Sequence, residues 1–163
     1  MEKFFEQLTS YNILNNLLPG AIFCYLLKYS MNITLLDSDL IGNLFFYYFC
    51  GMVISRVGSV IIEPVLKKVK YVKFAEYKDF VKASKKDSKI EVLSESNNMY
   101  RTFIALFTIL IITKIYYNLS QKFIILNSIW KVLILVILLI LFLMSYRKQV
   151  NYIKKRVDIN VND

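Results

Sequence analysis

The sequence predicts an all-α integral membrane protein with four transmembrane helices, the second and third of which extend into a cytosolic helical hairpin. Apolar residues make up 56% of the 163 residues and gather in long runs. Runs of about 20 such residues match the thickness of a bilayer's hydrocarbon core. The charged residues concentrate between these runs and after the last one. Both patterns are typical of one membrane domain with polar connections.

The first part of the chain predicts a surface helix followed by two spans. In residues 1–16, apolar side chains recur every three to four positions, as in an amphipathic helix at the membrane interface. The alternative is a cytoplasmic continuation of the first span. Because Pro19 is tolerated in a helix's first turn, we place the first span at residues 17–36. An acidic turn leads to the second span, residues 40–62.

Residues 64–101 form the predicted hairpin, in which lysines alternate with acidic residues and aromatic residues. Pro64 removes the backbone donor that would bond to Val60, so we expect a kink at the membrane boundary. We expect one helix from Val65 to about Ala83 and a turn at residues 84–87.

The second helix of the hairpin begins with Ser88, followed by Glu91 at the spacing of a capping box. We expect this helix to run into the third span, residues 103–118. The fourth span, residues 123–146, contains the longest apolar run of the chain, and a basic tail, residues 147–163, follows it.

The cationic side chains predict the orientation. With four spans, the N-terminus, the hairpin and the tail share one side, which carries most of the 21 Lys and Arg residues. The positive-inside rule places that side in the cytoplasm. The abundance of Lys, Asn and Ile is associated with AT-rich bacterial genomes. We therefore expect a multi-pass protein of the bacterial plasma (inner) membrane, with both termini cytoplasmic.

Small residues recur at every fourth position of the second span, at Gly51, Ser55 and Ser59. Small residues let helix backbones approach closely in lipid, where packing drives association. We interpret this stripe as a helix-packing surface, and it suggests a homo-oligomer.

Polar residues at the cytoplasmic ends of the second and third spans are the first candidates for function. Arg56 and Glu63 are either a polar switch between helices or a structural pair, with Arg56 reaching toward the interface. Asn97, Asn98 and Arg101 enter the membrane at a matching depth, so we expect an Arg101–Glu63 contact between neighbouring helices. The alternative for this second group is a solvated helix end.

Three lysines occupy the outer parts of three different spans: Lys28, Lys114 and Lys131. Facing inward in an oligomer, they would form a cationic ring that favours anions. The alternative, which we favour, is that they extend to the outer interface beside neighbouring aromatic residues.

The composition argues against several classes of function. Histidine is absent, which removes the commonest metal ligand and general base. Cys24 and Cys50 both fall in apolar runs and are interpreted as buried thiols. We therefore expect that the protein is not an enzyme and that it has no catalytic residue, no metal site and no cofactor. The acidic residues of the hairpin argue against direct nucleic-acid binding, whereas its lysines suit an anionic ligand.

The segment from Gly51 to Pro64, together with residues 97–102, resembles sequences of small multi-span membrane proteins encoded in bacterial anti-phage defence clusters. The resemblance implies a membrane sensor or effector that oligomerises and works with a cytosolic protein partner. Our leading hypothesis is therefore a non-enzymatic sensor or effector that couples a cytosolic signal to the lipid membrane. The alternatives are a small oligomeric ion channel or transporter, and a membrane scaffold that anchors a soluble partner.

Overall fold

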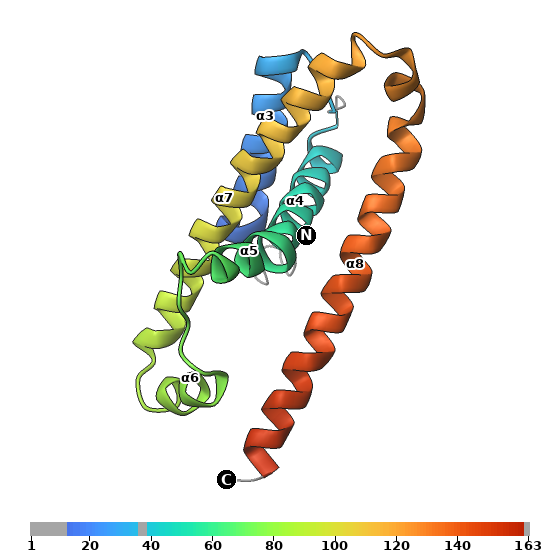
Figure 1. Ribbon diagram of the computed structural model, residues 1–163. Helices are drawn as coiled ribbons and strands as arrows, with labels where there is room; N and C mark the ends of the chain where they lie inside the picture. The colour runs from blue at the N-terminus through green and yellow to red at the C-terminus, as the bar shows by residue number, and fades with distance from the viewer. Residues whose placement is uncertain (1–12, 36–38, 162–163) are drawn as a thin grey trace.

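The computed structural model describes residues 13–35 and 39–161, and the regular structure of these residues is entirely helical. Helices α3, α4 and α7 pack together, and α8 runs beside them (Figure 1). In chain order the elements are the π-helical turn η1 (Ile13–Leu17), α3 (Leu18–Met31), α4 (Leu40–Val57), the π-helical turn η2 (Gly58–Ile62), α5 (Glu63–Lys68), α6 (Tyr77–Ser84), α7 (Lys89–Ser120) and α8 (Ile124–Val161).

Three helices in the described part of the chain are long and apolar enough to cross a membrane: Leu40–Lys68, Lys89–Ser120 and Ser128–Val161. The predicted first span corresponds to α3, which has 14 residues and is not one of the three. The all-α prediction is therefore confirmed, with three candidate spans in place of the four that were predicted.

The entry into α3 differs from the prediction. Residues 1–12, and with them most of the predicted interfacial helix, lie outside the described residues. The remainder belongs to η1, which leads without a break into α3, and Pro19 occupies the first turn of α3 as expected. Of the predicted acidic turn only Asp39 is described. It caps α4, because its carboxylate accepts hydrogen bonds from the backbone N–H groups of Ile41 and Gly42 at 3.1 and 2.9 Å.

The continuous segment of η1 and α3 approaches α4 closely at two glycines. A Cβ at Gly20 would collide with the backbone of Tyr47, and a Cβ at Gly51 would collide with the backbone of Asn16. Both positions therefore need glycine for steric reasons. The close approach that the sequence predicted for Gly51 occurs within one chain.

The bend after α4 has a backbone origin. The N–H of Glu63 bonds to the carbonyl oxygen of Gly58, five residues back, which is the register of a π-helix. Pro64 follows and has no N–H to continue either register. The chain changes direction from α4 into α5 (Figure 1), at the place where the sequence predicted a kink.

The predicted hairpin is only partly correct. The helix expected from Val65 to Ala83 is interrupted: α5 ends at Lys68, Lys70 has a φ of 60°, and α6 begins at Tyr77. Ser88 occupies the predicted N-cap position of α7, but its side chain makes no capping hydrogen bond. The carboxylate of Asp87 instead accepts from the N–H of Lys89 at 2.9 Å. The prediction that the second helix runs unbroken into an apolar span is confirmed by the 32 residues of α7.

Helix α8 is the most loosely packed of the long helices. The basic tail continues it to Val161, and its buried residues over positions 128–161 are Leu141 and Ser145. The preceding apolar stretch, residues 128–137, is exposed along its whole length. The far end of α8 contacts α6, where the rings of Tyr77 and Tyr152 lie 5.6 Å apart.

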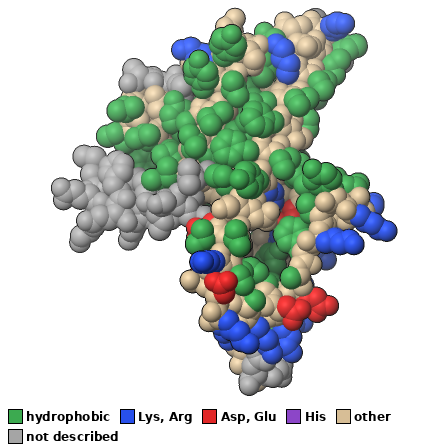
Figure 2. Space-filling view, turned by 90° about the vertical axis from the view of Figure 1, so that its left-hand side faces the viewer, with side chains coloured by type: hydrophobic (Ala, Val, Ile, Leu, Met, Phe, Trp, Pro, Cys, Tyr) green, Lys and Arg blue, Asp and Glu red, His purple; other side chains and the backbone are tan. Residues whose placement is uncertain are grey.

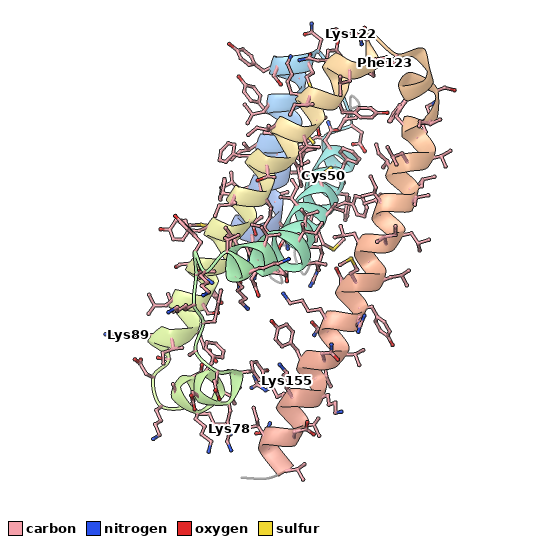
Figure 3. The ribbon with its side chains drawn as sticks, viewed as in Figure 1. Cys50, Lys78, Lys89, Lys122, Phe123 and Lys155 are labelled. Atoms are coloured by element: carbon pink, nitrogen blue, oxygen red, sulfur yellow. The ribbon has the colours of Figure 1, made fainter. Side chains whose placement is uncertain are left out.

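The surface is divided into an apolar band and two charged ends. Figure 2 shows hydrophobic side chains across the upper and middle parts of the face, with most charged side chains gathered below them. Figure 3 places Lys78 of α6 and Lys155 of α8 at this lower end, and Lys122 and Phe123 at the opposite end. This division is consistent with a protein that lies in a membrane.

Candidate functional site

The carboxylate of Glu63 is the centre of an ion-pair cluster. Glu63 is 6% exposed. Its Oε2 accepts a hydrogen bond from Nη1 of Arg101 at 2.5 Å, and its Oε1 lies 2.9 Å from Nζ of Lys67 and 3.4 Å from Nζ of Lys148. We call these four residues the Glu63 cluster. It joins α5, α7 and α8, and it contains the predicted Arg101–Glu63 contact.

Helix geometry explains two of the three ion pairs. Lys67 lies four residues after Glu63 in α5, so both side chains fall on one face. Arg101 reaches Glu63 because α7 approaches the chain closely at Gly58. A Cβ at Gly58 would lie 3.2 Å from the carbonyl oxygen of Arg101, and 3.4 Å from its Cγ.

Lys148 is held by the bend as well as by Glu63. Its Nζ donates to the backbone oxygen of Ser59 at 2.6 Å and to the Ser59 hydroxyl at 2.9 Å. In the π register, the oxygen of Ser59 would accept from the N–H of residue 64, which is a proline. Lys148 supplies the hydrogen bond that Pro64 cannot donate.

The cluster depends on Glu63 more than on any one cation. A buried carboxylate is costly unless it is paired, and these ion pairs offset that cost. The three cations repel one another and are brought together by the one carboxylate that they share. Removal of Glu63 would leave like charges side by side in a partly buried position, which is more destabilising than loss of one lysine.

A second polar contact lies between helices, one residue along the chain from Arg101. The hydroxyl of Thr102, which is fully buried, lies 3.1 Å from the side-chain oxygen of Asn15 and 2.9 Å from the backbone oxygen of Asn98. This contact links η1 to α7. Sequence analysis did not single out Thr102 or Asn15, and a polar residue directly after Arg101 at the start of an apolar run was the available signal.

The other predicted polar residues have different surroundings. Arg56 is exposed on α4, and the ion pairs of Glu63 within the described residues are to Arg101, Lys67 and Lys148. Asn97 is exposed, whereas Asn98 is half-buried and accepts the Thr102 bond through its backbone. Sequence analysis assigned Lys148 only to the basic tail.

The predicted packing stripe takes part in different contacts along its length. Gly51 packs against η1, and Ser59 binds Lys148 through its backbone and its hydroxyl. Ser55 is half-buried. The thiols of Cys24 in α3 and Cys50 in α4 lie close enough to interact. Neither forms a disulfide, and Cys24 is buried as predicted, whereas Cys50 is half-buried.

Each of the three lysines near the other end has its own surroundings. Lys114 donates to the backbone oxygen of Ser30 at 2.7 Å, close to the C-terminal end of α3. Lys131 lies over the ring of Trp130, 5.9 Å from its centroid, and Lys28 is exposed. Among the described residues, no group of His, Cys, Asp and Glu side chains has the arrangement of a metal site.

Comparisons of this chain with protein-family models, with curated proteins and with solved structures find no match. The resemblance to membrane proteins of anti-phage defence clusters therefore stays a prediction from the sequence.

Proposed function

We propose that this chain is a non-enzymatic sensor or effector of the bacterial inner membrane that acts in anti-phage defence. In this proposal it homo-oligomerises and couples a cytosolic signal or protein partner to the lipid membrane. The single observation that supports this role best is the Glu63 cluster, in which one carboxylate joins three separate helices at the ends of their apolar segments.

The proposed topology has four spans and two cytoplasmic termini. The continuous helix of η1 and α3 covers residues 13–31, a length of about 28 Å at 1.5 Å per residue. That length approaches the thickness of the hydrocarbon core. The basic residues of α5, α6 and the end of α8 then lie on the cytoplasmic side, in agreement with the positive-inside rule.

The proposed coupling runs from α6 to α8. Tyr77 of α6 contacts the ring of Tyr152, and Nζ of Lys85 donates to the side-chain oxygen of Asn160 at 3.3 Å. One turn of helix before Tyr152, Lys148 binds the cluster. A partner that displaces α6 would therefore act on the segment of α8 that is attached to Glu63.

The loose packing of α8 supports a role for this helix in the response. Its apolar stretch, residues 128–137, is exposed in the single chain, so changes at the Glu63 cluster can alter its position without disrupting the core around Ile54 and Leu106. In our proposal this stretch contacts lipid or a second copy, and its movement changes membrane permeability or partner docking.

The test uses the full chain expressed in a bacterium. We expect Glu63→Gln to change both the membrane potential, read with a potential-sensitive dye, and the subunit number in native gels. Glu95→Gln, which removes a carboxylate from the exposed surface of α7, is the matched control. An unchanged potential and an unchanged subunit number in well-expressed Glu63→Gln would contradict the proposal. Steady conductance of purified protein in a planar bilayer would favour a constitutive channel instead.

A further inference from the structure

The cations of the Glu63 cluster form the strongest unassigned binding feature of the molecule. We propose that Lys67, Arg101 and Lys148 bind a phosphate group at the membrane surface. This inference assumes that the chain lies in a membrane, and it does not depend on the sensor or effector role.

The charges of the cluster do not balance. Three cations surround one carboxylate, and Glu63 is the acidic partner in each of their salt bridges within the described residues. Two positive charges therefore remain uncompensated in a partly buried position. An anion that binds beside Glu63 would neutralise them, and its oxygens would accept hydrogen bonds that are strengthened by charge.

Suitable donors remain available. Lys67 carries three N–H donors, of which one reaches Glu63, and its Nζ lies 4.1 Å from the centroid of the Phe74 ring. The Nε of Arg101 is buried and has no hydrogen-bond partner among residues 13–35 and 39–161. A buried donor of this kind is costly unless it is satisfied. The guanidinium also matches the geometry of a phosphate.

Part of the cluster is accessible from outside. The side chain of Lys67 is 43% exposed and that of Lys148 is 25% exposed, whereas Glu63 is shielded. A ligand thus meets the cations before it meets the carboxylate. This order of exposure favours an anion over a metal ion or an amine.

The position of the cluster suits a lipid headgroup. Lys67 and Lys148 follow the apolar parts of their helices and Arg101 precedes that of α7, so all three lie where an apolar span meets polar chain. Exposed apolar side chains adjoin them on α5 and α8, including Val65 and Met144. Acyl chains can pack on these side chains while the phosphate reaches the lysines.

The experiment measures lipid binding to the full-length protein in detergent by native mass spectrometry. The probe is phosphatidylglycerol, and the electrically neutral phosphatidylcholine is the comparison. We expect Lys67→Gln to weaken phosphatidylglycerol binding about fivefold, the effect of one juxtamembrane cation. Lys68→Gln is the matched control, because Lys68 is exposed in the same helix but does not reach Glu63. We expect the Lys68→Gln variant to bind phosphatidylglycerol as tightly as the wild type.

A second variant tests the direction of the effect. Glu63→Gln removes the competing negative charge, so we expect tighter phosphatidylglycerol binding, in contrast to Lys67→Gln. Circular dichroism shows whether the Glu63→Gln variant is folded. If it is not folded, the comparison of Lys67→Gln with Lys68→Gln decides whether the phosphate site exists. Equal weakening by Lys67→Gln and Lys68→Gln, or weaker binding by folded Glu63→Gln, would overturn the proposal.

A further arm separates the two sources of phosphate. Inorganic phosphate is titrated into delipidated protein and into protein that carries phosphatidylglycerol. Lipid binding that resists millimolar phosphate assigns the site to a headgroup. Binding of inorganic phosphate that depends on Lys67 but not on Lys68, without lipid retention, assigns it to a soluble phosphate. If neither probe binds in a Lys67-dependent way, no phosphate site exists there.

Discussion

The ammonium group of Lys148 donates to the backbone oxygen of Ser59 at 2.6 Å, although the two residues lie 89 positions apart. The contact follows from the backbone at the α4–α5 bend, where Pro64 cannot donate a hydrogen bond. A side chain from α8 satisfies that oxygen and at the same time reaches Glu63. The bend therefore serves as an attachment point for the most loosely packed long helix.

Replacement of Lys148 tests this attachment. We expect Lys148→Met to destabilise the protein by about 2 kcal/mol, the usual cost of losing hydrogen bonds from a charged donor. The measurement is the free energy of unfolding in sodium dodecyl sulfate titrations. Arg147→Met is the control, since Arg147 is exposed and adjacent. Equal stability of the Lys148 variant and the wild type would show that α8 is not held at the bend.

Coupling between Glu63 and Arg101 can be measured by a double-mutant cycle. Glu63→Gln leaves three cations without their shared carboxylate, whereas the double variant with Arg101→Gln removes one of them. We expect the double variant to be less destabilised than the sum of the single variants, with a coupling energy of about 1–3 kcal/mol. Additive effects on unfolding would mean that the two side chains do not interact in the folded protein.

Steric exclusion at Gly51 predicts a large effect from one methyl group. A Cβ there collides with the backbone of Asn16, which cannot move without shifting η1. We expect Gly51→Ala to destabilise the protein by about 2 kcal/mol or more. Gly42→Ala is a milder comparison, because the new methyl group meets the carboxylate of Asp39, a movable side chain. Thermal melts of both variants in detergent give the comparison.

The two cysteines report on the α3–α4 contact. Because the two thiols lie close enough to interact, we expect copper phenanthroline to form an intramolecular disulfide in membranes. The product migrates as a monomer with altered mobility on non-reducing gels, and Cys24→Ser abolishes the shift. Disulfide-linked dimers in place of this product would be incompatible with the packing of α3 on α4.

A substitution at Arg56 distinguishes an effect on the stability of the single chain from an effect on the proposed assembly. Its side chain is exposed in the single chain, so we expect Arg56→Leu to change the free energy of unfolding by less than about 0.5 kcal/mol. In the proposed homo-oligomer, the same substitution changes the subunit number, measured in native gels. A strongly destabilised Arg56→Leu variant would indicate that Arg56 is engaged within its own chain.

The extent of the hairpin shows where sequence patterns fail. Aromatic residues between Tyr71 and Phe80 recur at helical spacing, yet residues 72–76 are not helical. The chain leaves the helix at Lys70, which adopts a left-handed conformation with φ at 60°. The spacing of aromatic residues does not predict such a conformation for a lysine. The hydrogen bond to the Asp87 carboxylate was missed for a related reason: Asp87 and Ser88 are both good capping residues, and the local turn decides which side chain accepts the bond.

The sequence by itself determined the all-helical class, the apolar segments and the position of the bend, and it offered the pairing of Arg101 with Glu63 as one of two alternatives. Each of these depends on local chemistry: chain hydrophobicity, the missing N–H of Pro64, and the high cost of an unpaired charge near the end of an apolar helix. Only the tertiary structure decided that Lys148 joins the cluster, that Gly51 packs against η1 of its own chain and that Arg56 stays exposed. These outcomes depend on the rotation and distance of helices that are remote in sequence, and helical periodicity carries no information about either.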